Sequence, residues 1–418
     1  MQIRVDRAWA RAVAVLSAAG LSAAFLAVVP DAAAAVPVTG PGSVAAGGAH
    51  ACAVVDDGRV KCWGLNNSGQ LGNGHSGNGL VAKRPVAVVG VKGATAVAAG
   101  GAHSCALLKA GGKVVCWGSN SQGQLGNGTR VDSSKPVPVI GVGGTGTLTG
   151  VIAIAAAQNH TCALLAAAAG SVKCWGQNTN GVLGNGSDSG LAALDPESVN
   201  GLTRVVAIST STNDTCAALK GGSLKCWGFN QYGELGPGTY GPDSCEVGDT
   251  AFGCSTTPVT VQGVKGVLGV SVRPHSTCVV AVKGRIICWG LNISPHSVEA
   301  KDFVTLTGVT GAVAVSGPGD VVLYGDEEFA CAMLITRTAK CWGSNDHGQL
   351  GNGTKKSTNA PTSVSGLKRA TAISAGADFA CAPVVLPKAV LCWGDNGYGQ
   401  LGNGGVPGNG VAVSVLGL

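Results

Sequence analysis

The tripeptide Cys-Trp-Gly occurs seven times in this chain, at intervals of 51 to 62 residues. Two positions after the glycine of each copy stands an asparagine, and six copies continue into a Gly-x-Leu-Gly-x-Gly turn. A repeat period of about 50 residues is typical of propellers and solenoids, in which each repeat is one supersecondary unit. The chain is therefore predicted to consist of seven equivalent units, whose tripeptides start at Cys62, Cys116, Cys174, Cys226, Cys288, Cys341 and Cys392.

Each unit contains four short runs, which we term a, b, c and d in chain order. In the second unit they cover residues 94–99, 104–108, 113–117 and 136–140. Runs of four to six Val, Ala, Leu and Ile residues bounded by glycine are too short for helices and are typical of buried strands. The 68 glycines also favour tight turns over long helices. The predicted fold class is all-β, a seven-bladed β-propeller of four-stranded antiparallel blades.

The cysteines set the register of the hairpin that runs b and c form. In the first unit the loop 56–58 places Cys52 opposite Cys62, and Gly58 supplies the positive φ of a three-residue loop. In later units the cysteines stay opposed although the loop length varies, which indicates a disulfide and not a metal site. Each such bond is expected to contribute about 2 to 3 kcal/mol. The expected pairs, one in each blade and an extra one in the fourth, are Cys52–Cys62, Cys105–Cys116, Cys162–Cys174, Cys216–Cys226, Cys245–Cys254, Cys278–Cys288, Cys331–Cys341 and Cys381–Cys392.

Strand alternation assigns the connections to two faces of the propeller. The a–b turns and the long c–d loops share one face, and the b–c and d–a turns share the other. The tryptophan after each c-run cysteine is expected to pack against the neighbouring blade. The strand order leaves open whether the last d run, residues 411–415, completes its own blade or joins the first.

The first 35 residues have the pattern of a secretory signal peptide. Arg4, Arg7 and Arg11 precede an apolar run over residues 12–29, and alanines 33–35 offer a cleavage site. The alternative is a membrane anchor, because the run approaches the roughly 20 residues that span a bilayer. We expect cleavage, which leaves residues 36–418 as one secreted propeller domain. The 16 cysteines agree with an oxidising, extracellular destination.

The charge of the expected mature chain is mild. The full chain has a net charge of +6, and the predicted signal removes three arginines and two aspartates, which leaves +5. The remaining Lys and Arg residues form no basic run, so we expect neither a nucleic-acid partner nor membrane binding after cleavage. The mature chain is expected to be a monomer.

The repeated unit resembles the regulator of chromosome condensation repeat. The shared pattern is His-x-Cys-Ala-Leu, a glycine turn, Val-x-Cys-Trp-Gly-x-Asn and Gly-Gln-Leu-Gly-x-Gly, and it covers roughly residues 42–418. The resemblance implies a seven-bladed propeller. Members of the family include a nuclear guanine-nucleotide exchange factor, accessory domains of ubiquitin ligases and exported bacterial propellers that inhibit β-lactamases. No set of inhibitory residues carries over position by position.

Three histidines, His50, His103 and His160, stand two residues before the b-run cysteine in the first three units. In adjacent blades they would form an arc on one rim, where a transition-metal site is conceivable. A structural role that closes the a–b turn is the preferred interpretation, so we predict no metal and no cofactor. Later units carry other residues at this position, namely Asp214, Ser276, Phe329 and Phe379.

The fourth unit has an insertion, residues 237–257, in its c–d loop. It contains the extra cysteine pair, and a long loop with its own disulfide is usually ordered and often functional. Aromatic residues on the same face could anchor a partner, although an ordinary decorated loop is the alternative. The candidate binding residues are Tyr232, Tyr240, Phe252, Tyr324 and Tyr398.

Catalysis has little support in the sequence. No Ser, His and Asp residues stand in a nucleophile-elbow context, and the Gly-x-Leu-Gly-x-Gly turns precede no helix that could bind a dinucleotide phosphate. The chain is therefore predicted to be a non-enzymatic scaffold that binds a protein or a surface glycan. Inhibition of a secreted enzyme such as a β-lactamase is the alternative, and exchange-factor activity is a third, weaker hypothesis.

Overall fold

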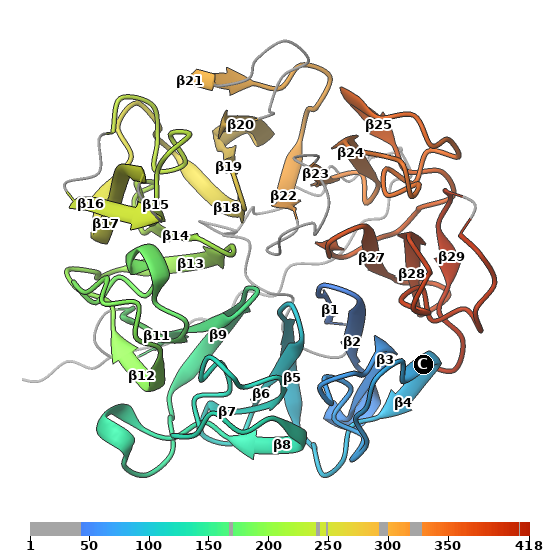
Figure 1. The fold of residues 1–418 in the computed structure, drawn as a ribbon. Coiled ribbons are helices and arrows are strands. Elements are labelled where there is room, and N and C mark those ends of the chain that lie inside the picture. The colour runs from blue at the N-terminus through green and yellow to red at the C-terminus, as the bar shows by residue number, and fades with distance from the viewer. Residues whose placement is uncertain are drawn as a thin grey trace, which may run out of the picture. The chain divides into compact units, whose positions relative to one another are not determined.

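The computed structural model describes residues 43–166, 170–239, 243–247, 250–291, 300–317, 328–408 and 410–418. The predicted signal peptide lies outside the described residues. Within them the chain forms seven separate antiparallel sheets in a ring (Figure 1). In six sheets the strands pair in chain order from the centre outward, and the seventh, in blade 4, differs only at its outer edge, which confirms the predicted seven-bladed propeller.

Each blade is built from consecutive strands. Blades 1 and 2 comprise β1 (Val44–Ala46), β2 (His50–Val54), β3 (Val60–Leu65), β4 (Val81–Ala87), β5 (Ala94–Ala99), β6 (His103–Leu108), β7 (Lys113–Gly118) and β8 (Ser133–Pro138). Blades 3 and 4 comprise β9 (Val151–Ala156), β10 (His160–Leu165), β11 (Val172–Gly176), β12 (Ala193–Ser198), β13 (Val205–Thr210), β14 (Asp214–Leu219), β15 (Leu224–Phe229), β16 (Asp243–Val247) and β17 (Thr250–Thr260). Blades 5 to 7 comprise β18 (Val267–Arg273), β19 (Ser276–Ala281), β20 (Arg285–Gly290), β21 (Ala300–Thr305), β22 (Ala312–Ser316), β23 (Phe329–Leu334), β24 (Ala339–Gly343), β25 (Thr358–Ser363), β26 (Ser374–Ala375), β27 (Phe379–Val384), β28 (Ala389–Gly394) and β29 (Val413–Ser414).

Helical structure in the described residues is confined to single 3-10 turns. They are η1 (Asp56–Gly58), η2 (Val142–Gly144), η3 (Thr179–Gly181) and η4 (Val282–Gly284). In the described part of the chain, no helix has the length and hydrophobicity needed to cross a bilayer.

The register of the middle hairpins confirms the sequence prediction. In blade 1, Cys52 pairs with Cys62 and Val54 with Val60. The same direct opposition recurs in all seven blades, and all seven intra-blade disulfides are present, together with Cys245–Cys254. In each blade, the disulfide therefore links the two central strands and closes a short loop between them.

The outer strands depart from the prediction. In blade 2 the d run was expected at 136–140, but β8 covers Ser133–Pro138. The N–H of Val139 still donates to Val114 of the paired strand β7, whereas the N–H of Ile140 turns away and donates to the carbonyl of Gly126 in the c–d loop. The outer strand is a half-exposed edge that contains two prolines, and prolines are tolerated at such an edge. In blade 7 the expected strand 411–415 shortens to β29, which pairs with β28 of its own blade.

The insertion in blade 4 is a hairpin and not a loop. Its strands β16 and β17 pair with each other, and β17 also pairs with β15. Blade 4 therefore has five strands where four were predicted.

The hydrophobic core lies between the blades. Each cluster of buried residues combines the sheet of one blade with the tryptophan of the next. Between blades 1 and 2, for example, Leu71 and Val88 pack with Val97, Ala106 and Trp117. The prediction that these tryptophans pack against a neighbouring blade is confirmed.

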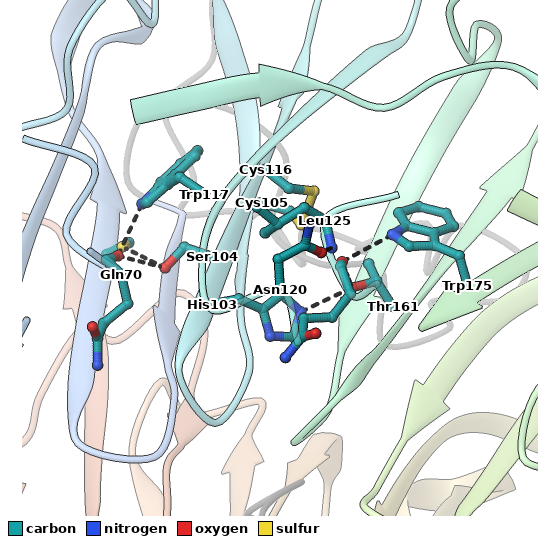
Figure 2. The surroundings of a disulfide bond; sticks show 12 residues. Gln70, His103, Ser104, Cys105, Cys116, Trp117, Asn120, Leu125, Thr161 and Trp175 are labelled. Atoms are coloured by element: carbon teal, nitrogen blue, oxygen red, sulfur yellow. Dashed lines mark hydrogen bonds between the residues drawn. A yellow bond between two sulfur atoms is a disulfide. The ribbon is translucent and has the colours of Figure 1, made fainter. Parts of the chain in front are cut away.

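A polar contact fixes each tryptophan in place. The indole Nε1 of Trp117 donates to the backbone carbonyl of Gln70 in the preceding blade at 2.8 Å, and Trp175 donates to Gln124 at 3.0 Å (Figure 2). The same bond recurs from Trp63, Trp227, Trp289 and Trp393. For Trp342, the corresponding residues of blade 5, 292–299, lie outside the described residues. We call this bond the indole clamp.

The repeated asparagine and glycine of the motif shape the turn that accepts the indole clamp. The side-chain oxygen of Asn120 accepts the N–H of Leu125 at 3.0 Å, so it holds the turn closed (Figure 2). At Gly126, φ is +62° and a Cβ would come within 2.7 Å of the ring of Trp175. Only glycine satisfies both conditions without strain.

The ring closes with the same interaction. Trp63 of blade 1 donates to the carbonyl of Gln400 in blade 7 at 2.8 Å. The side chain of Lys61 also donates to the carbonyl of Gly417, one residue before the last residue of the sequence. The first and last blades therefore meet side by side without exchanging a strand.

We predict that Gly126→Ala destabilises the propeller by about 2 to 4 kcal/mol, because it adds a clash with Trp175 to the cost of a positive φ. Gly190→Ala is the matched control, since Gly190 has a similar φ of +67° and nothing within 4 Å of its Cβ position. The control should cost only about 1 kcal/mol. Chemical denaturation of both variants measures the difference, and equal losses would contradict the packing argument.

Candidate functional site

The three repeated histidines lie between adjacent blades and are fully buried. His50 Nε2 lies 2.8 Å from the Ser104 hydroxyl, and His103 Nε2 lies 2.9 Å from the Thr161 hydroxyl (Figure 2). Ser104 donates its own proton to the Gln70 carbonyl at 3.0 Å. Each hydroxyl has one proton, so the imidazole Nε2–H must be the donor to it. Ser104 and Trp117 donate to the same Gln70 carbonyl, so the histidine contact lies directly beside the indole clamp.

The partner residues vary together around the ring. Where a blade has histidine, the following blade has Ser104, Thr161 or Thr215. Where a blade has phenylalanine, at Phe329 and Phe379, the following blade has alanine, at Ala380 and Ala51. A polar pair in one contact is therefore replaced by an apolar pair in another, and neither leaves a single hydroxyl beside a phenyl ring.

Burial keeps these histidines neutral. It lowers the pKa of His50 to about 4 and that of His160 to about 3. The pKa of His103 falls to about 3 because of burial and, to a lesser degree, the charges of the other two. Among the described residues, no group of three or more His, Cys, Asp or Glu side chains is placed to hold a metal ion. The arrangement fits a contact between blades.

A second set of buried polar groups occupies the same face in blades 4 to 6. We call Asp214, Glu234, Arg273 and Glu328 the buried charged cluster. Arg273 Nε lies 3.5 Å from Glu328 Oε2, and both side chains are almost fully buried. Glu328 also accepts the Ser276 hydroxyl at 2.6 Å and the His275 N–H at 2.8 Å.

The cluster arises from a local exchange of residues. In blades 1 and 2 the a–b turn has glycine next to the histidine ring, and a Cβ at Gly47 would meet His50 at 2.8 Å. Blade 5 has Arg273 in place of that glycine and Ser276 in place of the histidine. The arginine therefore takes up room that the smaller serine leaves, and its Nη2 lies 3.3 Å from Cys278 Sγ.

Two carboxyl groups of the cluster, those of Asp214 and Glu234, have raised pKa values. Burial raises the pKa of Glu234 to about 8, and the charge of Glu328 adds to the rise. Burial, followed by the charge of Glu234, also raises the pKa of Asp214 well above its ordinary range. Such shifts are typical of functional acids when the group faces a cleft. Here both side chains have no exposed surface.

A cavity of about 390 Å³ lies on the axis of the ring. The innermost strands line it with small residues such as Ala98, Ala155, Ser209 and Ser271. Within the described part of the chain, no charged side chain lines it, and none of the four cluster residues borders it.

Of the candidate aromatic residues, Tyr232 and Tyr398 have described side chains, and they lie in different blades. Tyr232 lies in the c–d turn of blade 4, where its ring is 5.4 Å from His275 and 6.1 Å from Phe229. Tyr398 occupies the matching turn of blade 7 and is 48% exposed. Phe252 lies in β17, but its side chain is outside the described part. Tyr240 and Tyr324 lie outside the described residues.

The hairpin of β16 and β17 is anchored on two blades. Asp243 accepts the N–H of Thr256 at 2.8 Å and its hydroxyl at 2.7 Å. The carbonyl of Thr256 in turn accepts the N–H of Gly186 in blade 3. The Cys245–Cys254 disulfide ties the two strands. The hairpin is therefore a fixed feature that the other blades do not share in the described structure.

Comparison with known proteins matches the RCC1-like domain over residues 19–382. The chain belongs to the RCC1-like domain family. Ultraviolet-B receptor UVR8 of Arabidopsis thaliana is 26% identical over 381 residues, 86% of this chain and 78% of the receptor. E3 ubiquitin-protein ligase HERC2 of Homo sapiens is 27% identical over 358 residues, 81% of this chain but 7% of the ligase. Secretion-regulating guanine nucleotide exchange factor of Bos taurus is 27% identical, over 78% of this chain and 71% of that protein.

Solved structures agree on the fold of this RCC1-like chain. Yeast RCC1 (Prp20) bound to Kap60 superposes with a TM-score of 0.69 at 18% identity, over 85% of this chain and 83% of that one. Human WBSCR16 gives a TM-score of 0.66 at 20% identity, over 82% and 86%. These likenesses show the propeller architecture.

Sequence reasoning missed the buried charged cluster of this RCC1-like propeller. The signal was present in the alignment of the repeats, because Glu234 stands where other turns have glutamine and Arg273 where other turns have glycine. Asp214 was noted only as a substitute for histidine. The burial of these groups became visible only when the blades were placed side by side.

We predict that His103 and Thr161 are energetically coupled. His103→Phe alone should destabilise the fold by about 1 to 2 kcal/mol, because it leaves the Thr161 hydroxyl beside an apolar ring. Adding Thr161→Ala recreates the Phe and Ala pair of other blades, so the double variant should recover about 1 kcal/mol relative to the sum of the single losses. Strict additivity in urea unfolding would contradict the coupling.

We also predict that Glu234→Gln raises the free energy of unfolding by an amount that depends on pH. Since burial raises the pKa of Glu234 to about 8 from 4.5, the unfolded chain releases a proton that the folded chain keeps. The contribution of Glu234 to the free energy of unfolding is therefore fully present below pH 4.5 and is lost progressively as the pH rises to about 8. The variant should match the parent near pH 4 and exceed its free energy of unfolding by about 2 kcal/mol or more above pH 8.

The reverse substitution in blade 2, Gln124→Glu, is the matched control for this effect. It places a carboxyl at the equivalent buried turn position and should create a stability loss that grows with pH. A difference from the parent that stays constant with pH in either variant would refute the assignment.

Proposed function

We propose that this chain is a secreted, non-enzymatic scaffold that binds a protein partner through the face carrying the a–b turns and c–d loops. The observation that carries the proposal is the hairpin of β16 and β17. It breaks the sevenfold repetition on this face, its disulfide ties its two strands together, and Thr256 at its base bonds to Gly186 of blade 3. A rigid, asymmetric projection is suited to selective recognition because little entropy is lost on binding.

The charge of this face supports a protein partner with a basic surface. In its described turns and loops, three basic residues stand against five acidic ones whose side chains are not buried. The basic residues are Arg130, Lys355 and Lys356, and the acidic ones are Asp132, Asp188, Asp346, Asp378 and Asp395. Complementary charge raises the rate and selectivity of association.

The relatives support a binding role in coarse terms. One similar structure is a complex of yeast RCC1 with Kap60, and another concerns the binding of Prp20p to Gsp1p and histones. These partners belong to those proteins. The burial of Asp214 and Glu234 away from any substrate argues for binding without catalysis.

Export is part of the proposal. All cysteines pair into eight disulfides, with no free cysteine among the described residues. Disulfides persist in oxidising compartments and are rare in reducing ones. A secreted scaffold could also inhibit a secreted enzyme, and a β-lactamase panel assayed with the purified protein tests that special case.

We predict that removing the hairpin abolishes partner capture. Residues 237–257 would be replaced by the nine residues 127–135 of blade 2, which connect the same two strands and remove both extra cysteines together. Affinity capture from the producing cell's surroundings, quantified by mass spectrometry, compares this variant with the full chain. Proteins bound by the full chain should fall at least tenfold with the variant, as expected for loss of an interface hot spot.

A loop exchange in blade 1 is the control. Residues 73–84 would be replaced by the same nine residues, which changes a c–d loop without touching the hairpin. Equal capture by the hairpin variant and the full chain would refute the proposed face. Binding to a glycan array without any captured protein would refute the protein partner.

A further inference from the structure

The face opposite the hairpin is a continuous ring of short turns. Backbone hydrogen bonds join the d–a turns to neighbouring b–c turns. Lys109 N–H donates to Gly93 at 2.9 Å, and Gly150 N–H donates to Gly111 at 2.9 Å. The pattern recurs from Lys220 to Arg204 and from Ile335 to Gly311. These backbone bonds hold the turns of neighbouring blades side by side, and we call this surface the turn face.

The turn face is strongly basic. Its b–c and d–a turns contain thirteen exposed Lys and Arg residues and two Asp residues, which is a net charge of +11. The cations are Arg59, Lys92, Lys109, Lys113, Arg204, Lys220, Lys265, Lys283, Arg285, Arg337, Lys368, Arg369 and Lys388. The whole chain has a net charge of only +6, so most of its positive excess is gathered on one side.

Both aspartates of the turn face already have cationic partners. Asp57 accepts the Arg59 guanidinium at 2.9 Å, and Asp56 contacts the Lys388 ammonium where blade 7 meets blade 1. The other eleven cations face solvent without an acidic neighbour on these turns. A surface of this kind attracts anionic partners.

Exposed apolar side chains project from the same turns. In the b–c turns of blades 5, 6 and 7, Val282 is 43% exposed, Ile335 is 68% exposed and Leu386 is 75% exposed. Each stands within two residues of a cation of the ring, at Lys283, Arg337 or Lys388. Cations interleaved with apolar tips match the interface of an anionic bilayer, where the tips enter the headgroup boundary and the cations meet phosphates.

We propose that the turn face docks the propeller on a bilayer that contains anionic phospholipids. The planar ring lets cations from all blades approach one surface, and the apolar tips favour a bilayer over a soluble polyanion. The opposite face, with the hairpin, then points away from the membrane and stays open to a partner. The docking does not depend on the proposed protein scaffold role, since different turns carry the two surfaces.

This proposal revises the expectation drawn from the sequence. The cations were judged scattered because they lie in turns that are separated along the chain. Along the chain, the b–c and d–a turns alternate with the c–d and a–b connections of the other face. The basic residues of the turn face are therefore spread over the whole sequence and form no basic run in it.

The test is sedimentation of the expected mature chain, residues 36–418, with vesicles, because the apolar run over residues 12–29 would itself enter a bilayer. Vesicles of phosphatidylcholine alone are compared with vesicles that contain about 30% phosphatidylglycerol, at low and high salt. Binding should require the anionic lipid and weaken with salt, as the Debye length falls from about 10 Å at 0.1 M to about 3 Å at 1 M. The triple variant Lys283→Gln, Arg337→Gln, Lys368→Gln should reduce partitioning about tenfold or more.

The matched control is Arg130→Gln, Lys355→Gln, Lys356→Gln, which removes three exposed cations from the opposite face and should leave partitioning unchanged. A second variant, Ile335→Asn with Leu386→Asn, should weaken vesicle binding about threefold or more but leave retention on heparin unchanged. Absence of binding to anionic vesicles at low salt would overturn the proposal. Equal losses in both charge variants, or heparin binding without vesicle binding, would also overturn it.

Discussion

The bond from each indole Nε1 to the carbonyl of the preceding turn is the interaction on which the propeller depends. A blade of four short strands cannot bury both of its faces alone, so its stability comes from its neighbours. The indole clamp aligns each blade with the previous one, as Trp117 does with Gln70. It also explains the motif as a whole: Asn120 closes the turn, Gly126 leaves room for the ring, and the Cys105–Cys116 bond fixes the strand that carries Trp117.

Around this fixed bond, the neighbouring residues change in matched sets. Histidine with a hydroxyl in one contact gives way to phenylalanine with alanine in another, and glycine with histidine gives way to Arg273 with Ser276. Each set fills the same space. Within the described residues, the histidines leave their buried Nδ1 atoms without a hydrogen-bond partner. One carboxyl oxygen of Asp214 and one of Glu234 also have none, and both residues lie in blade 4, which carries the hairpin. The repeated framework therefore tolerates local variation on the face that we propose for partner binding.

Much of this structure could be predicted from the sequence because the same structural unit is repeated seven times and the repeats can be compared. The opposition of Cys52 and Cys62, the inner strands and the packing of Trp117 all depend on contacts within one or two adjacent units. The outer strand β8 was misplaced because an edge strand with prolines has no strong apolar pattern. The hairpin β16–β17 lacked a repeated counterpart for comparison. The basic turn face was not predicted because Lys109 and Lys220 are far apart in the sequence. They lie on one surface only because the alternating strands place their turns on the same face and the blades close into a ring.

Exchange of the indole protons tests the central claim most directly. In protein with ¹⁵N-labelled tryptophan, the Nε1–H signals of Trp63, Trp117, Trp175, Trp227, Trp289 and Trp393 should persist long after transfer into D₂O, because each is buried and bonded to the preceding blade. Exchange of these six protons at the rate of free indole would contradict the indole clamp and the account of the ring built on it.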